Sequence, residues 1–157
     1  MNKCFQTSLS IILLSCFTLI VHSNIQGQTA KRVYVEAGGE AFLYSVNYDM
    51  RLTDRPEKNG IGIRVGVAVF EDILIAPLQV NYLLGKNGKY FEIGAGGTIW
   101  TGVTDFGDGT TGFEFVPTAG LRYRSQPLDG GFTWSFGVAT LTRFFFAMPS
   151  LSIGYAF

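Results

Sequence analysis

The sequence predicts an all-β chain that folds as a single antiparallel up-and-down β-barrel of about eight strands. Successive segments alternate apolar with small or polar residues at a period of two, as strands with one apolar face require. Charged residues make up only 15% of the chain, below the roughly 25% of a typical soluble protein. No apolar stretch is long enough for a membrane-spanning helix. A membrane-like composition without such a helix favours a closed barrel, because backbone polar groups in hydrocarbon must pair internally.

A secretory signal peptide is predicted for residues 1–28, and the barrel for residues 29–157. Lys3 precedes an apolar run from Leu9 to Val21, and polar residues follow it. The run is 13 residues long, whereas a membrane-spanning helix needs roughly 20. The pattern leaves the cleavage site open between Ser23 and Gln28.

A lipoprotein signal is the alternative, because the residues from Leu13 to Cys16 look like a lipobox. The apolar run continues past Cys16, however, whereas a lipidated cysteine should open a polar linker. Both cysteines, Cys4 and Cys16, lie in the segment that is removed, and the single histidine, His22, lies in or beside it. The mature chain is therefore expected to have no thiol, no disulfide and no cysteine metal site.

Six segments show the alternation clearly, and turn signals rich in Gly, Asn, Asp and Pro separate them. They are residues 61–70, 74–84, 90–100, 113–124, 132–140 and 149–157.

The segment 32–53 is too long for one uninterrupted strand. Its apolar residues change from odd to even positions around Gly38, Gly39 and Glu40. Because a slip of one residue turns every side chain to the other face, either a β-bulge or a tight turn must reset the phase there. A single-chain bacterial barrel has an even number of strands, so a total of eight needs a turn near Gly38 or a short strand within 101–111.

The last strand places Leu151, Ile153, Tyr155 and Phe157 on one face and small residues on the other. An alternating strand that ends on an aromatic residue resembles the C-terminal strand of bacterial outer-membrane β-barrels. The whole mature chain is similar in pattern to the small, uncharacterised barrel families of Gram-negative bacteria.

The resemblance implies an outer-membrane location and names these four residues as the signal that the barrel-assembly machinery reads. It further implies outer-membrane lipid as a partner and a monomeric state. The short connections near 85–88 and 126–131 would then be periplasmic, and the longer 101–111 connection would face outside.

Alternation alone does not say whether the apolar face meets lipid or an internal core, as in lipocalin-like barrels and β-sandwiches. The opposite face is built mainly of Gly, Ala, Ser and Thr, which suits a narrow lumen better than a water-exposed surface. Aromatic residues lie near strand ends, as interfacial girdles require. Together with the export signal and the aromatic C-terminus, these features favour lipid.

The strand phase directs a set of acids and bases into the lumen. We expect a lumen charge network of Glu36, Arg64, Glu92, Glu114, Arg122 and Arg124, with Asp49 and Arg51 as companions. An eight-stranded barrel is about as wide as the side chains that fill it. Buried charges must be paired, so these residues favour a structural plug of ion pairs, and the alternative is a gate or narrow polar path.

The expected function is that of a structural or porin-like outer-membrane barrel with a largely plugged lumen, without enzymatic activity, cofactor or metal. The alternative is a small-ligand or surface-binding barrel, either a carrier of lipid or another hydrophobic ligand or an adhesin. Catalytic outer-membrane barrels such as lipid A deacylases, phospholipases and omptin-like proteases use a histidine, which the mature chain lacks.

Two short sequence matches do not indicate a function. The stretch from Gly94 to Gly97 lies within a predicted strand, so it favours close packing rather than a phosphate-binding loop. Asp105 and Asp108 miss the spacing of an EF-hand, which favours a solvated turn. The sequence also lacks a basic stripe, so nucleic acid is not expected as a partner.

Overall fold

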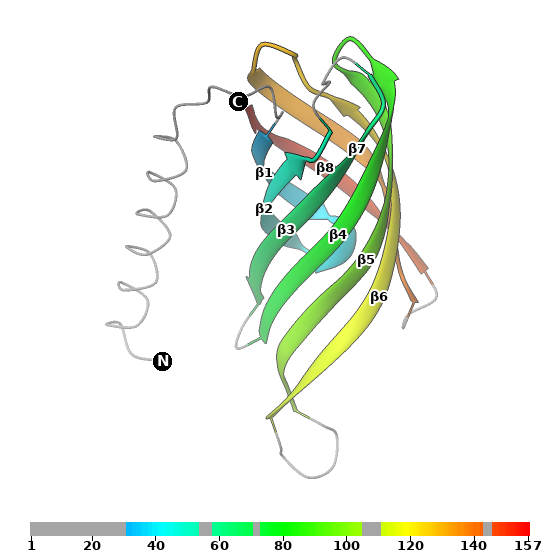
Figure 1. Cartoon of the computed structure of the whole chain (residues 1–157). Helices are drawn as coiled ribbons and strands as arrows, with labels where there is room; N and C mark the ends of the chain where they lie inside the picture. The colour runs from blue at the N-terminus through cyan, green and yellow to red at the C-terminus, as the bar shows by residue number, and fades with distance from the viewer. Residues whose placement is uncertain (1–30, 54–57, 71–72, 105–110, 143–145) are drawn as a thin grey trace, which may run out of the picture.

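The computed structural model describes residues 31–53, 58–70, 73–104, 111–142 and 146–157. These residues form a closed barrel of eight antiparallel strands, in which neighbours in sequence pair and the last strand returns to the first (Figure 1). The strands are β1 (Lys31–Gly38), β2 (Tyr44–Arg51), β3 (Gly60–Phe70), β4 (Ile73–Lys86), β5 (Lys89–Thr104), β6 (Thr111–Ser125), β7 (Gly131–Leu141) and β8 (Phe146–Ala156). The predicted fold, an all-β up-and-down barrel of about eight strands, is confirmed. The predicted signal peptide lies outside the described residues.

Backbone pairing between β1 and β8 closes the barrel. The Lys31 amide donates to the Phe157 carbonyl at 3.0 Å, and the Phe157 amide donates back to the Lys31 carbonyl at 2.9 Å. Closure leaves no exposed sheet edge along this seam, which removes a site for unwanted pairing with other chains.

The up-and-down topology gives the barrel two distinct ends. Lys31, Phe157 and the connections that follow β2, β4 and β6 lie at one end, which we call the chain-end rim. The connections that follow β1, β3, β5 and β7 lie at the other end, the far rim (Figure 1). The short connections near 85–88 and 126–131 are therefore at the same end as the chain termini of the barrel, and the 101–111 connection is opposite.

The phase change in the segment 32–53 is a tight turn and not a β-bulge. Gly38 and Gly39 have φ values of 75° and 70°, a backbone region that favours glycine, and a 3₁₀ turn, η1 (Gly39–Ala41), follows. A Cβ on Gly38 would lie only 2.0 Å from the Pro149 carbonyl oxygen. The turn folds into the barrel, so that Glu40 is 0% and Ala41 3% exposed. The extra strand proposed within 101–111 is not formed by the described residues there, because residues 101–104 extend β5 and Thr111 begins β6.

The glycine-rich stretch from Gly94 to Gly97 lies inside β5, and its small side chains allow close approaches. A Cβ on Gly96 would lie 2.1 Å from the Leu78 carbonyl oxygen, and one on Gly97 would overlap the Phe115 ring at 2.1 Å. The interpretation of these glycines as packing positions is confirmed.

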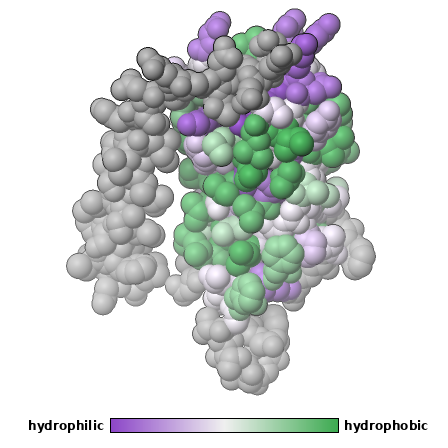
Figure 2. All heavy atoms as spheres, viewed as in Figure 1, coloured by the Kyte–Doolittle hydropathy of each residue, from purple (hydrophilic) through white to green (hydrophobic). Residues whose placement is uncertain are grey.

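The barrel wall is apolar outside and polar inside. Figure 2 shows hydrophobic residues over much of the visible wall, with the most prominent group of hydrophilic residues at the chain-end rim. Some of the buried apolar residues form a small cluster near the far rim, which consists of Ala41, Ala68 and Ile75 with Ile73 and Trp100 against them. Most of the remaining buried positions are polar or charged, and these form the candidate site.

Candidate functional site

Four arginines and four acidic residues fill the middle of the barrel, and we call them the charge cluster. Every member is at most 1% exposed. Four positive and four negative charges leave the cluster with no net formal charge. Its members come from β1, η1, β2, β3, β5 and β6, and they are Arg32, Glu36, Glu40, Asp49, Arg64, Glu92, Arg122 and Arg124.

Glu40 is the centre of the half nearer the far rim. Its two carboxylate oxygens pair separately with Arg64 Nη2 and Arg122 Nη2. Gln79 Nε2 donates a further hydrogen bond to Glu40 Oε1 at 2.8 Å. Glu36 contacts the same two arginines, with Arg122 Nε at 3.1 Å and Arg64 Nη1 at 3.6 Å. Two acids thus neutralise two arginines that come from different strands.

Asp49 and Glu92 organise the other half around Arg124. Arg124 donates to both Asp49 oxygens, at 3.1 and 3.2 Å, and to Glu92 Oε2 at 3.1 Å. Arg32 Nη2 lies 3.4 Å from Glu92 Oε2 and 3.7 Å from Asp49 Oδ2. Asn81 Nδ2 donates to Asp49 Oδ2 at 2.7 Å.

Contacts of Arg122 and Tyr34 join the two halves. Arg122 Nη1 lies 3.6 Å from Glu92 Oε1. Tyr34 adds a second link, because its hydroxyl accepts from Arg64 Nη1 at 3.1 Å while its ring lies 4.0 Å below the Arg32 guanidinium carbon. Arginines on opposite sides of the lumen therefore belong to one connected network.

Every carboxylate of the charge cluster faces at least two arginines, and this pairing makes the burial tolerable. A buried charge is costly unless it is paired and hydrogen-bonded. Removing one member leaves a partner uncompensated, which typically costs about 3–5 kcal/mol. The cluster also lies in the narrow interior that a barrel of this size offers.

The structure brings five of the six predicted network residues together, and it does not bring in Glu114. Glu36, Arg64, Glu92, Arg122 and Arg124 are all in the charge cluster. Glu114 is half-buried, and its neighbour in the backbone register of β5 is Trp100. It lies eight residues from Arg122 along β6, which corresponds to about 26 Å at the rise of a strand.

The two predicted companions are separated. Asp49 belongs to the charge cluster, whereas Arg51 lies at the chain-end rim. There Arg51 donates from Nε to Thr53 Oγ1 at 3.1 Å and from Nη2 to the Lys58 carbonyl, and its guanidinium carbon is 5.2 Å from the centre of the Tyr90 ring.

Sequence reasoning missed two charged members, Arg32 and Glu40. Arg32 shares the even-numbered, inward phase of Glu36 on β1, so the alternation could have identified it. Glu40 lies in the turn, where no periodicity applies, and only the inward fold of η1 places it in the lumen.

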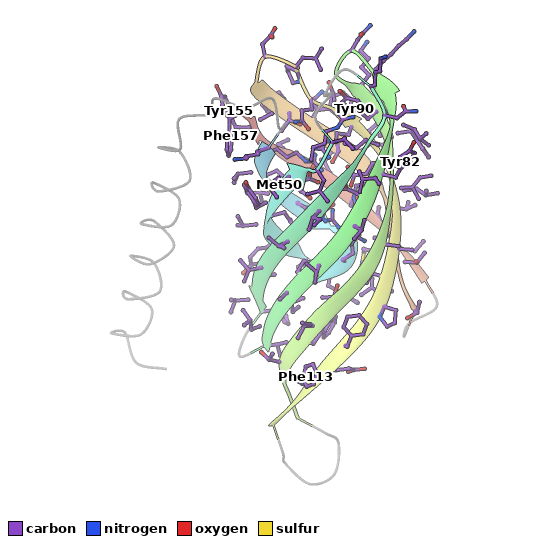
Figure 3. All side chains as sticks on the ribbon, viewed as in Figure 1. Met50, Tyr82, Tyr90, Phe113, Tyr155 and Phe157 are labelled. Atoms are coloured by element: carbon purple, nitrogen blue, oxygen red, sulfur yellow. The ribbon has the colours of Figure 1, made fainter. Side chains whose placement is uncertain are left out.

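The four residues of the predicted insertion signal lie along the outer surface of the barrel seam. Leu151, Ile153 and Tyr155 are 59%, 55% and 61% exposed on β8. Phe157 is half-buried beside Lys31, and Figure 3 shows Tyr155 and Phe157 close together at the chain-end rim. Their reading as a signal remains a prediction.

Within the described ranges, no three His, Cys, Asp or Glu side chains are grouped so that they could hold a metal ion. Asp105 and Asp108 lie outside those ranges. In the described part of the chain we find no helix with the length and hydropathy of a membrane span. No protein-family model, curated protein or solved structure matches this chain.

Proposed function

We propose that this protein is an outer-membrane β-barrel of a Gram-negative bacterium with a closed lumen and a structural, non-enzymatic role. The observation that carries the proposal is the inverted polarity of the barrel. Large apolar side chains cover the outside, whereas the arginines and acids of the charge cluster are buried. A barrel dissolved in water would be stabilised by the opposite arrangement, because apolar surface exposed to water is unfavourable.

The outer wall carries apolar residues along every strand at mid-height. Leu78 is 50%, Val80 56% and Phe136 52% exposed. The charged residues that the structure describes on the outer surface lie at the chain-end rim, and they are Lys31, Lys58, Lys86, Lys89 and Asp129. Glu114 has the inward phase of β6. An uncharged apolar wall of this kind suits contact with acyl chains.

The apolar wall has the height of a membrane. Outward apolar residues on β4 run from Leu74 to Leu84. At the rise of a strand and a tilt of roughly 40°, those residues span about 25 Å, the height of the apolar band of outer-membrane barrels.

Exposed aromatic residues lie toward both ends of this wall. Tyr82 and Tyr155 lie toward the chain-end rim, and Phe113 lies toward the far rim, near the start of β6 (Figure 3). Tyr44, 53% exposed at the start of β2, also lies at the far rim. Two aromatic levels that border an apolar band are typical of the two membrane–water interfaces.

The predicted signal peptide and the aromatic C-terminal strand support export and insertion by the barrel-assembly machinery. The chain-end rim would then face the periplasm, and the protein would be a monomer surrounded by outer-membrane lipid. Residues 29–157 contain no histidine or cysteine, and this supports a role without acyl-transfer or thiol chemistry.

The membrane assignment is tested by the protein's need for an apolar solvent. We expect residues 29–157 to fold and stay monomeric in detergent micelles, with a gel mobility that changes on heating, and to aggregate in plain buffer. Cell fractionation should find the native protein in the outer membrane. A folded monomer that is stable in buffer without detergent would end the proposal.

The closed lumen is tested by Arg64→Ala. The change leaves Glu36 and Glu40 with one arginine fewer, so we expect the free energy of unfolding in micelles to fall by about 3–5 kcal/mol. Single-channel conductance in planar bilayers should change little, because the remaining charge cluster still fills the lumen. Asp129→Ala, which removes an exposed charge at the chain-end rim, serves as the control. A large new conductance with unchanged stability would favour a gate over a structural plug.

A further inference from the structure

Three exposed lysines gather on one side of the chain-end rim. Lys86 and Lys89 flank the tight turn between β4 and β5, and Lys58 lies in the connection between β2 and β3. Asn59 Oδ1 accepts a hydrogen bond from the Gly85 amide at 2.7 Å, which ties the two connections together. Arg51 also donates to the Lys58 carbonyl from inside the rim.

Lys86 and Lys89 are held close together by the backbone. They are direct cross-strand partners, and the turn between them has left-handed residues at Asn87 (φ 56°) and Gly88 (φ 77°). Directly opposed side chains have Cβ atoms about 5 Å apart, and like charges in such pairs are destabilising. An anion bound between the two ammonium groups would relieve this repulsion.

The lysine pair points toward the surroundings of the barrel and not into its lumen. Lys86 and Lys89 continue the outward register in which Leu84 opposes Phe91, and Tyr82 opposes Ile93 one step further from the rim. Figure 3 shows Tyr82 on the outer surface below this rim. From mid-barrel to the rim, the outward side chains therefore change from apolar residues to lysines. A membrane leaflet changes in the same order, from acyl chains to headgroups.

The charge balance of this part of the rim favours an anion. The connection 52–59 contains Asp54, Arg55, Glu57 and Lys58, whose formal charges sum to zero. Lys86 and Lys89 therefore supply an excess of two positive charges beside it. The described acid elsewhere on this rim is Asp129, in the connection between β6 and β7.

We propose that Lys58, Lys86 and Lys89 form a headgroup site for an anionic glycerophospholipid in the leaflet that surrounds the chain-end rim. The lysines bind the phosphodiester and its negative charge, and the acyl chains lie along Leu84, Phe91 and the apolar residues beyond them. The site rests on the proposed membrane function, because the lysines meet lipid headgroups only if the wall below them is in acyl chains.

The test measures lipid preference with phosphatidylglycerol as the probe. The refolded protein is reconstituted in phosphatidylcholine nanodiscs doped with phosphatidylglycerol, and native mass spectrometry records the lipids that remain bound after release into detergent. Each lysine near an anionic surface contributes about five-fold in affinity. We therefore expect Lys86→Gln/Lys89→Gln to lower the preference for phosphatidylglycerol by about 25-fold, and Lys86→Arg/Lys89→Arg to retain it.

Lys31→Gln is the matched control, because Lys31 is an outward lysine of the same rim on β1, outside the three-lysine group. As the loss of one surface charge, it should lower the preference by no more than about five-fold, well short of the double glutamine variant. The double glutamine variant should unfold in zwitterionic micelles no more easily than the wild type, because it loses a like-charge pair. High salt should weaken the wild-type preference.

The inference is overturned if the wild type shows no preference for phosphatidylglycerol, or if the double glutamine variant keeps it. Effective competition by soluble glycerol phosphate would also overturn it, since the site would then bind a free phosphate. These failures are distinguishable from a failure of the membrane assignment: a barrel that inserts in pure phosphatidylcholine discs but ignores phosphatidylglycerol removes only the headgroup site, whereas a barrel that does not insert removes both.

Discussion

The Glu40→Ala variant is expected to lose about 3–5 kcal/mol of unfolding free energy in detergent micelles. Glu40 pairs with Arg64 and Arg122 at once and accepts from Gln79. Without its carboxylate, four buried arginines face three acids, and the inward turn loses its ion pairs with β3 and β6. Urea unfolding monitored by tryptophan fluorescence measures the change.

Two variants separate the buried ion pair from a general charge effect. Asp129→Ala also removes one negative charge, but from an exposed turn, so its effect should stay within about 0.5 kcal/mol. Glu40→Gln keeps the shape and part of the hydrogen bonding, and it should fall between the wild type and Glu40→Ala. Equal stabilities for Glu40→Ala and Asp129→Ala would contradict the role of the turn in the charge cluster.

The Val80→Arg variant is expected to be destabilised by about 2–4 kcal/mol when the barrel is folded in lipid vesicles. Val80 is 56% exposed at mid-height on the outer wall, between Ile63 and Ala95 on the neighbouring strands. An arginine there must enter the hydrocarbon. On a water-exposed surface the same substitution would change stability by no more than about 0.5 kcal/mol, so this single variant separates the two environments.

Leu84→Arg provides the depth control for Val80→Arg. Leu84 shares the same outward face of β4 but lies two residues before Lys86, near the chain-end rim. The cost of an arginine falls to about 0–1 kcal/mol near the interface. If both variants are as stable as the wild type in vesicles, the outer wall is not in hydrocarbon.

Strand alternation was a strong predictor of this fold. Each clearly alternating segment became one strand with the predicted inward and outward faces. Most strands extend by one to a few residues beyond the predicted bounds, and β8 begins earlier but ends at Ala156, one residue before the predicted end. The period of a strand depends only on local backbone geometry, and this is why it can be read without knowledge of the partners. The total of eight strands was also predicted, because single-chain bacterial barrels have an even number of strands. The shift of phase at Gly38 left open whether a bulge or a turn lies there.

The candidate site was predictable only where its residues lie in strands. Five arginines and acids of the charge cluster were identified from their inward phase, and Asp49 was a correct companion. Glu114 has the same phase as Arg122, yet it lies far along β6, because phase gives the face of the sheet but not the height at which a side chain meets the others. The height of a side chain depends on the register between neighbouring strands, which the alternation does not give.

The sequence by itself determined that this chain forms strands with an apolar and a polar face, and that the polar face carries balanced charges. It did so because alternation and composition are local properties of the chain. Only the tertiary structure decided that the turn after β1 folds into the lumen and that Glu40 lies between Arg64 and Arg122. Those contacts join residues 24 and 82 positions apart in the chain, and closure of the barrel, which no local pattern encodes, is what brings them together.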